Sequence, residues 1–503
     1  MLNKKIKIII FCVLMILVAA QVKAQNNFYK KLPPSVVNNI QDNRLAKVNS
    51  INVKLKKFEN YLYQFKDFDQ EIPIELINYS QEKSPYIFSE EEAIEDVDFL
   101  FKLFKYGYAA YEYFGGDQKF NKVKENIIKD IKRKSLFSKI LVSSFESIVV
   151  QNLNFIQDGH FVIAEESFLD KYYYFTSPRF DFLKNEEGYY TNLDGKRMYL
   201  LEVNGEEVEK YMKQSLNKDG KIIYRLGLLS NQNNSNIHIE AKFVNNEKIR
   251  VEEVVFLKEN SYTKGKKSPY NTKEVSGITV IEHKTANSNP TNIKALEKFS
   301  REANKFKDEK FFIIDLRGNT GGNSWYALEW VKNYTGATPK SEFIQVSLNT
   351  RTTYKLLKNG FKKFYELDNP ESNSIYKEIL KVDKSGWSEV EYNSPHMIEN
   401  NNLIVVLIDS HVASAGECFV SYLRQVENVI FLGVNTTGLV NTGNMGLCQL
   451  PNSKINVYLP KDLELEANFV LREGKGFNPD FWVKSPEALD KAISFLKRYY
   501  IDN

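Results

Sequence analysis

The segment 410–417 (SHVASAGE) combines a serine with small residues at a predicted strand-to-helix turn. It follows the apolar run 402–409 and precedes a helical pattern. The hydroxyl of Ser414 could act as a nucleophile there, because a helix start favours negative charge that develops nearby. The same letters also fit a capping box between Ser414 and Glu417, which needs no chemistry. The motif lacks the GxSxG pattern, which disfavours an ordinary α/β-hydrolase.

A second segment, 315–322 (DLRGNTGG), overlaps the end of another apolar run. A glycine-rich turn between a strand and a helix can aim backbone N–H groups at an anion. No lysine follows in the P-loop position, so phosphate binding is disfavoured. The remaining functional interpretation is an oxyanion hole at Gly321 or Gly322. The alternative is a tight turn that only needs a positive φ. We interpret Asp315 and Arg317 as structural.

A serine nucleophile needs a base, and the chain has five histidines. His160, in the sequence Asp-Gly-His, lies in a loop between a predicted helix and an apolar strand-like run. His411 is close to Ser414 in the sequence, but we interpret it as a solvent-facing turn residue. Neither CxxC nor HExxH occurs, so no zinc site is predicted and no cofactor is implied.

These motifs need a sheet that brings their strand ends together. From Ile278 onward, buried-type strands alternate with helices, which predicts a parallel sheet covered on both faces in an α/β fold. A capping box at residues 89–92 begins a helical pattern earlier in the chain. The expected parts are a signal peptide (1–24), a helical lobe ending in the His160 loop (25–165), a small β-rich domain (166–257), a linker (258–277) and an α/β core (278–503).

The first 24 residues of this 503-residue chain have the pattern of a secretory signal: lysines, then an apolar run, then Val-Lys-Ala. Export to the periplasm or the medium is the prediction, and an uncleaved anchor is the alternative. The full chain has a net charge of +4, but the signal holds four lysines and no acid. The mature chain is therefore near neutral, which argues against nucleic-acid binding. No later apolar run is long enough to predict an integral membrane span.

Cys418 and Cys448 remain after removal of the signal, which contains Cys12. Export permits a disulfide between them. Two buried thiols are the alternative, because the sequence does not give the separation of the two residues.

The motifs in their order resemble those of the C-terminal-processing, or tail-specific, serine peptidases. DLRGNTGG after one strand is followed by SAGE after another and then by 433–438 (GVNTTG). The resemblance covers most of the mature chain and is strongest over 278–483. Residues 200–206 (LLEVNGE) resemble part of a divergent PDZ domain. The resemblance implies a ClpP/crotonase-like α/β core and hydrolysis of peptide or protein substrates.

One branch of that family pairs the serine with a lysine after a Thr-x-Gly turn. Here that turn, 436–438, is followed by Leu439, which argues against a Ser/Lys dyad. The chain is more similar to the branch of the tricorn core peptidase, which uses Ser, His and Glu. This resemblance implies Ser414 as nucleophile, His160 as base, Glu473 in support, and N–H groups of Gly321 or Gly322 and of Ala415 as the oxyanion hole. One departure is Gly159, where that branch can carry a serine.

Two other functions are compatible with the same residues. One is a catalytically inactive peptide-binding protein on this fold, which the missing lysine and the weak PDZ signal motivate. The other is an esterase or amidase with the same Ser/His pair. The sequence does not predict the oligomeric state. It does not identify the residues that select a substrate either, because loops line substrate pockets and only a structure can place those loops. The leading prediction is an exported serine peptidase.

Overall fold

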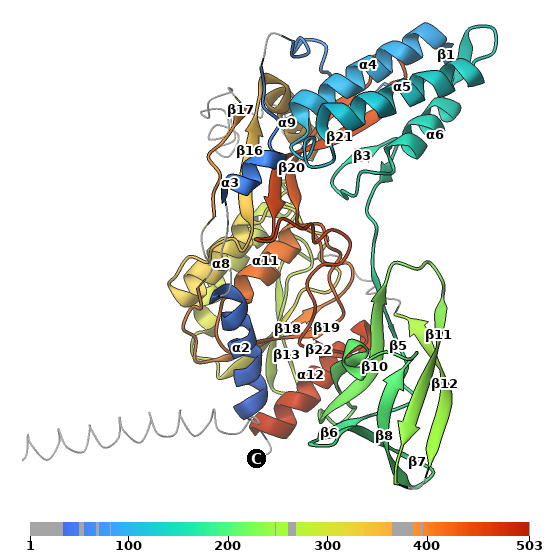
Figure 1. Ribbon diagram of the computed structural model, residues 1–503. Helices are drawn as coiled ribbons and strands as arrows, with labels where there is room; N and C mark the ends of the chain where they lie inside the picture. Colours follow the sequence, from blue (N-terminus) through green and yellow to red (C-terminus); the bar gives the residue numbers. More distant parts are fainter. Residues whose placement is uncertain are drawn as a thin grey trace, which may run out of the picture.

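The computed structural model describes residues 34–49, 55–66, 70–80, 82–246, 248–259, 268–364, 386–392 and 396–501. The predicted signal peptide lies outside these residues. None of the described helices is long and apolar enough to cross a membrane. Figure 1 shows three bodies: a helical lobe at the top, an α/β body in the centre and a separate antiparallel sheet below.

The central sheet confirms the predicted α/β fold. Its strand order is β13-β14-β15-β18-β19-β22, and all pairings except β13 with β14 are parallel. The strands are β13 (Asn271–Val275), β14 (Ile278–Glu282), β15 (Phe311–Asp315), β18 (Leu403–Ile408), β19 (Val429–Gly433) and β22 (Phe481–Trp482). β13 lies within the predicted linker. It is an exposed edge strand of polar residues, so its composition resembles that of a loop.

Helices cover both faces of this sheet, because its inner strands are apolar on both sides. In β18, Ile404 and Val406 belong to the buried cluster of α7 (Ile293–Glu302), α8 (Trp325–Thr335) and α11 (Ala415–Leu423). Leu403 and Val405 belong to the cluster of α12 (Ala488–Leu496) on the other face. The N-terminal helix α2 (Pro34–Asn49) is fixed to the core by an ion pair of 2.6 Å between Arg44 and Asp480.

The helical lobe contains α3 (Leu55–Phe58), α4 (Glu90–Gly107), α5 (Gly116–Lys134) and α6 (Val142–Leu153), with a short antiparallel pair of β1 (Ile87–Ser89) and β2 (Lys139–Leu141). α4 begins at the predicted capping box. The Ser89 hydroxyl accepts the Glu92 N–H at 3.0 Å, and the Glu92 carboxylate accepts the Ser89 N–H at 2.7 Å. These bonds satisfy N–H groups that a helix start otherwise leaves open.

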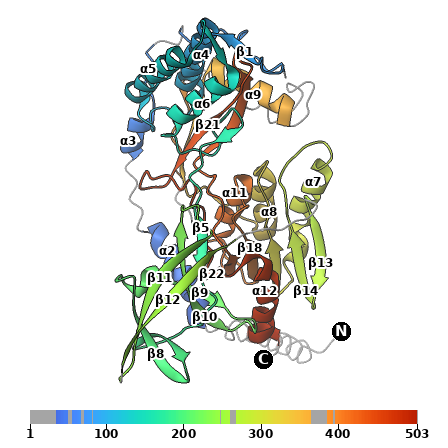
Figure 2. The same ribbon diagram turned by 90° about the vertical axis from the view of Figure 1, so that its right-hand side faces the viewer.

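Segments of the C-terminal half also build this lobe. β16 (Ile344–Asn349), α9 (Arg351–Phe364), β20 (Thr442–Gln449) and β21 (Asn456–Leu465) share one buried cluster with α4, α5 and α6. β21 pairs with β16, β20 and β3 (Val162–Ile163), while β4 (Glu166–Ser167) and β17 (Gly386–Trp387) lie at the two edges. The α/β core expected over 278–503 is therefore not one compact unit, because its β20–β21 hairpin is buried in the lobe (Figure 2).

The lower sheet has eight strands in the order β6-β7-β8-β11-β12-β5-β10-β9. They are β5 (Tyr173–Thr176), β6 (Leu183–Asn185), β7 (Gly188–Leu193), β8 (Lys196–Val203), β9 (Met212–Leu216), β10 (Ile222–Ser230), β11 (Asn236–Val244) and β12 (Ile249–Lys258). Asp194 and Gly195 form the two-residue turn between β7 and β8 with φ values of 51° and 77°. Such turns match the strand twist, which explains the signal in the sequence. The PDZ-like character of this region stays a prediction.

The contact between β20 and α9 can be tested with two glycines of one strand. A methyl group on Gly446 would come within 2.3 Å of the Leu356 Cβ, whereas one on Gly443 meets no atom within 4 Å. We expect Gly446→Ala to lower the free energy of unfolding by about 1–3 kcal/mol through overpacking. Gly443→Ala is the matched control and leaves it nearly unchanged. Chemical denaturation measures both, and equal stability of the two variants would contradict this packing.

Candidate active site

Two turns at the carboxyl ends of neighbouring strands form the base of the candidate site. β15 and β18 are parallel, with Asp315 opposite Leu407. The glycine-rich turn follows β15, and the turn that contains Ser414 follows β18. Ligands of parallel α/β sheets bind at this edge. The two sequence motifs are therefore brought together by the sheet itself.

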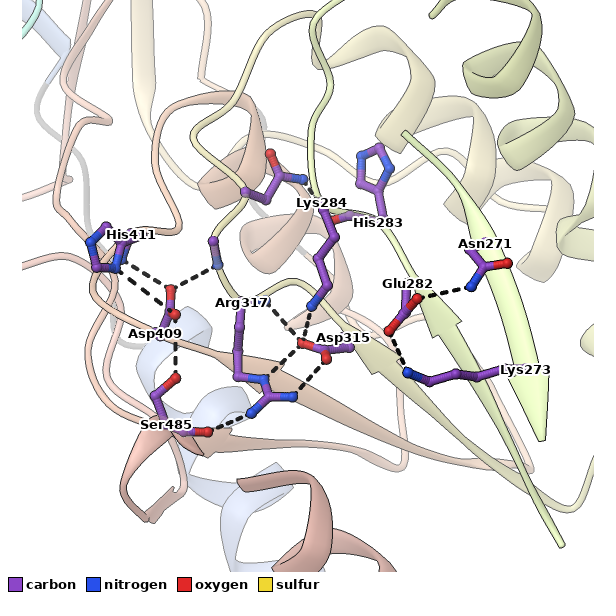
Figure 3. A network of polar contacts seen from close by, with 12 residues as sticks. Asn271, Lys273, Glu282, His283, Lys284, Asp315, Arg317, Asp409, His411 and Ser485 are labelled. Carbon is purple, nitrogen blue, oxygen red and sulfur yellow. Dashed lines mark hydrogen bonds and ion pairs between the residues drawn. The ribbon is translucent and has the colours of Figure 1, made fainter. Parts of the chain in front are cut away.

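Asp409 holds both turns in place, and its side chain is fully buried. One carboxylate oxygen accepts the N–H groups of Gly318 and His411, each at 3.0 Å. The other oxygen accepts the hydroxyl of Ser485 at 3.3 Å (Figure 3). A buried carboxylate is costly without such donors. This carboxylate thus links the two turns, together with the hydrogen bond from the Ala413 N–H to the Asn319 carbonyl at 3.0 Å.

Asp315 and Arg317 lie beside Asp409 as a buried ion pair with an N–O distance of 2.7 Å. Lys284 adds a second cation at 2.6 Å from Asp315 (Figure 3). Burial alone would raise the pKa of Asp315, but hydrogen bonds and charges from Arg317 and Lys284 outweigh it and lower the pKa to about 2. Arg317 also donates to the carbonyl of Ser485. These groups satisfy one another, which fits a structural role.

The glycine turn lies directly against Ser414. Gly321 has φ +97°, and a Cβ there would be 2.9 Å from the Ser414 Cβ. Gly322 has φ +136°, and a Cβ there would be 2.2 Å from the carbonyl oxygen of Ala286. Both positions therefore need glycine, for conformation and for close approach.

The candidate oxyanion donors differ in whether their N–H groups already donate a hydrogen bond within the protein. The N–H of Gly321 donates to the side-chain oxygen of Asn319 at 2.9 Å. Within the described residues, the N–H groups of Gly322 and Ala415 have no acceptor. The prediction of Gly321 as a donor is therefore disfavoured, because its N–H already stabilises the turn. Gly322 and Ala415 are the two that can serve a ligand.

Ser414 stands at the start of α11 in a strained backbone conformation, with φ 50° and ψ −120°. A non-glycine residue in this region costs about 1–3 kcal/mol, and such strain clusters at functional sites. The Oγ atom of Ser414 lies 3.2 Å from Nε2 of His160, a residue 254 positions away in the sequence. The turn thus presents the hydroxyl to an imidazole from another part of the fold.

Glu417 completes the predicted capping box and is fully buried. Its carboxylate accepts the N–H groups of Ser414 at 3.1 Å, Gly438 at 2.8 Å and Leu439 at 2.7 Å, and the hydroxyl of Thr436. Burial raises its pKa, against the effect of these donors. With all its contacts directed at turns, Glu417 joins the Ser414 turn to the turn at 436–439.

His160 lies in the loop between α6 and β3, and its side chain is 6% exposed. Its Nδ1 atom is 3.3 Å from the hydroxyl oxygen of Thr442. That hydroxyl donates its proton to Asp158 at 2.7 Å, so toward His160 it can only accept. Nδ1 therefore carries the imidazole proton, and Nε2 is left to accept the proton of Ser414. This tautomer is the one that a general base needs.

Asp158 anchors the loop of His160. Its Oδ1 atom accepts the His160 N–H at 2.9 Å as well as the Thr442 hydroxyl, and its Oδ2 atom accepts the Tyr108 hydroxyl at 2.8 Å. Burial lowers the pKa of His160, and the charge of Asp158 raises it in part. Burial thus favours the neutral imidazole, and a carboxylate lies near enough to stabilise a transient positive charge.

Glu473 lies in the same cluster but has no hydrogen bond to His160 among the described residues. Its Oε1 atom accepts the Asn441 N–H at 2.9 Å, and its Oε2 atom accepts the Gly159 N–H at 3.5 Å. Burial, followed by the charge of Asp158, raises the pKa of Glu473 well above its usual range. Its contacts are therefore with the residues that precede Thr442 and His160.

Three further histidines and Lys454, the first lysine after the turn at 436–438, have partners outside the Ser414 contact or are exposed. His411 is 43% exposed with Nδ1 4.0 Å from Asp409, as a turn residue would be (Figure 3). His238 is exposed beside Glu253, and Lys454 pairs with Glu82. His283 is buried, with Nδ1 2.7 Å from the carbonyl oxygen of Pro269. No described residue of these types besides His160 contacts Ser414 through a hydrogen bond.

The two cysteines among the described residues are free thiols, Cys448 in the core of the lobe and Cys418 beside the Ser414 turn. Burial raises the pKa of each thiol. No disulfide joins the two residues, and of the two expected buried thiols Cys448 is buried whereas Cys418 is partly exposed.

Three potential metal ligands, Asp158, His160 and Glu473, bring one donor atom each within 4.8 Å of one another. Asp158 already accepts three hydrogen bonds, and Glu473 accepts two from backbone N–H groups. His160 has a partner at each ring nitrogen. This hydrogen bonding favours a proton-handling site over a metal site.

The structure adds Thr442, Tyr108 and Asn441 to the residues that sequence patterns indicated. Thr442 lies 282 positions from His160, and no spacing rule links the two. Asp158 was visible only as part of the Asp-Gly-His sequence. The signal that could have drawn attention to Thr442 is its place four residues after Gly438, where the motif ends.

The pKa of His160 tests the electrostatics of this site. We expect it to lie below 6.5 in the native protein, because burial disfavours the imidazolium. Asp158→Asn should lower it further, since the raising charge is removed. Titration of the ring resonances by NMR measures both values, with Asp219→Asn, on an exposed loop, as the control. A pKa of His160 that rises in Asp158→Asn would contradict the arrangement.

Comparison with known proteins gives one family match. Residues 277–483 match the model of Peptidase family S41. No curated protein matches the chain. Solved structures with a similar outline include mature CPAF complexed with lactacystin, at 15% identity and a TM-score of 0.43, covering 82% of this chain and 99% of that one.

The photosystem II D1 C-terminal processing protease is 11% identical with a TM-score of 0.35, covering 80% of this chain and 97% of its own. A putative peptidase from Parabacteroides merdae is 13% identical with a TM-score of 0.37, covering 79% and 90%. Scores this low carry no argument about individual residues, so the branch within the family stays a prediction. The part of this chain that is similar to peptidase family S41 is therefore residues 277–483, which contain both turns of the candidate site.

Proposed function

We propose that this chain is an exported serine peptidase that hydrolyses peptide bonds through Ser414, with His160 as general base and Glu473 in support. The observation that carries the proposal is the 3.2 Å contact between the Ser414 Oγ and the His160 Nε2. A strained nucleophile position and a neutral imidazole of the correct tautomer support it. A coincidental surface contact would need neither feature.

In the proposed reaction, the Ser414 Oγ attacks the carbonyl carbon of the substrate while its proton moves to the His160 Nε2. The C–N bond then breaks, and His160 returns the proton to the leaving amine. Water, activated by His160 in the same way, releases the acyl group from Ser414. The Nδ1 proton stays hydrogen bonded to Thr442 throughout, and Asp158 stabilises the imidazolium through that hydroxyl.

The oxyanion of the tetrahedral intermediate is held by the N–H groups of Gly322 and Ala415 in this proposal. Their lack of an internal acceptor supports the assignment. Each such donor contributes about 3–4 kcal/mol to stabilisation of the transition state in serine peptidases. The start of α11 adds the favourable end of a helix dipole at Ala415.

Glu473 supports His160 by position rather than by charge. It holds the N–H of Asn441, which precedes Thr442, and the N–H of Gly159, which precedes His160. Burial, followed by the charge of Asp158, raises its pKa, which disfavours a second negative charge beside Asp158. Gly159 also lies against Leu439, where a Cβ would come within 2.2 Å of the Leu439 side chain. A serine before His160 would therefore require the Leu439 side chain to shift.

Covalent labelling with a fluorophosphonate probe tests this function directly. We expect one adduct by intact mass on the wild-type protein and none on Ser414→Ala. His160→Ala should slow labelling about 100-fold or more, because the base is lost. Glu473→Gln should stay within about tenfold of wild type, since an amide keeps an acceptor for one N–H group.

Matched controls are Ser147→Ala and His238→Ala, which change an exposed serine and an exposed histidine outside the site. Both should label at the wild-type rate. Labelling of Ser414→Ala at that rate would show a different nucleophile. A folded wild-type protein that forms no adduct would favour a peptide-binding protein without turnover. Adduct formation combined with hydrolysis of esters but not of peptides would favour an esterase.

A further inference from the structure

A pocket of about 150 Å³ opens beside Ser414. Its lining comes from α11, from β16 and the residues before it, from the segment 439–444 and from β21. Gly322 and Ala415, whose N–H groups are the proposed oxyanion donors, are part of the lining. A substrate held there therefore has its carbonyl at Ser414 and an adjoining side chain at this pocket.

The pocket is acidic and has no cation of its own. Among the described residues that line it, three are acidic (Glu417, Asp462 and Glu464) and none is Lys, Arg or His. Phe343, Tyr422 and Leu439 supply apolar wall. Such a wall suits the aliphatic stem of a long side chain whose charged end lies deeper or at the far wall.

Two of the three acids already have partners within the protein. Glu417 is hydrogen bonded to the turns on either side of it. Asp462 forms an ion pair of 2.6 Å with Lys461 and accepts the hydroxyl of Ser347 at 2.7 Å. Glu464 is partly buried and has no ion-pair partner within the described part of the chain.

None of the described groups that face Glu464 carries a positive charge. Asp462, on the same strand, is negative, and Gln345 on β16 offers only a hydrogen bond. Cys418 and Tyr422 face it from α11, and burial raises the pKa of both, so both are neutral near pH 7. Burial, followed by the charge of Asp462, raises the pKa of Glu464 to about 7. A carboxyl in this setting gains stability from a positive charge brought by a ligand.

We infer that this pocket binds the side chain of the residue whose carbonyl Ser414 attacks, and that Glu464 selects a cationic side chain, lysine or arginine. The inference rests on the proposed function and adds the substrate class to it. The lysine or arginine stem packs on Phe343 and Leu439 while its charge pairs with Glu464. Cleavage therefore occurs on the carboxyl side of a basic residue.

The test uses two internally quenched peptides that differ at one position, lysine in one and norleucine in the other. Mass spectrometry locates the cleavage after that position. We expect kcat/KM for the lysine peptide to exceed that for the norleucine peptide by about tenfold or more. Glu464→Gln should bring the ratio close to one. Glu240→Gln, an exposed acid on β11, is the matched control and should keep the wild-type ratio.

The wild-type ratio also has a pH dependence that needs no variant. Ionised Glu464 binds the cation, so the ratio should rise as pH increases through about 7, the pKa of the free carboxyl. The titration of His160 cancels, because it affects both peptides equally. A ratio that is flat between pH 6 and 8, or that persists in a folded Glu464→Gln variant, would overturn the assignment of Glu464.

Fluorophosphonate labelling, run in parallel, distinguishes a failure of the proposed peptidase function from a failure of the inferred preference for a basic residue. A wild-type protein that forms the adduct but cleaves the norleucine peptide as fast as the lysine peptide would overturn the substrate class alone. A wild-type protein that forms no adduct and cleaves neither peptide would overturn the proposed function and this inference together.

Discussion

The contact between Ser414 and His160 joins two bodies of the molecule, and it depends on the hairpin of β20 and β21. Ser414 belongs to the α/β core, whereas His160 ends the helical lobe. The hairpin begins beside the core and is buried among the lobe helices, so it fixes one body against the other. Thr442, its first residue, supplies the hydroxyl at the His160 Nδ1. The same strand pair thus sets both the position and the tautomer of the imidazole.

The site concentrates buried acids that backbone N–H groups and hydroxyls satisfy. Asp409 ties the two strand-end turns together, Glu417 ties the Ser414 turn to the turn at 436–439, and Glu473 ties the segments before His160 and Thr442. Each of these carboxyls bridges segments that are distant in the sequence. Loss of one would free a turn and leave unsatisfied N–H groups in a dry environment. The strain at Ser414 persists because these contacts determine the surrounding backbone.

Sequence patterns led to Ser414 and the glycine turn because both follow apolar strands of a parallel sheet, whose ends must be neighbours. The Asp-Gly-His motif also allowed His160 to be predicted from the sequence. The roles of Thr442 and Tyr108 could not be predicted, because they arise where the hairpin and α4 meet the His160 loop. β20 is polar and contains two glycines, and β21 has an ordinary strand pattern, so nothing in either sequence marked them as part of the lobe. The hydrogen bond from the Gly321 N–H to the Asn319 side chain likewise depends on the backbone conformation of the turn, which the sequence did not predict.

The most direct test of the account is a crystal structure of the protein after reaction with diisopropyl fluorophosphate. We predict phosphorus bonded to the Ser414 Oγ, with its non-bridging oxygen accepting the N–H groups of Gly322 and Ala415. The His160 Nε2 should lie within hydrogen-bond distance of the ester oxygen, with Thr442 at Nδ1. An adduct on another residue, or an oxygen that faces away from Gly322 and Ala415, would contradict the account.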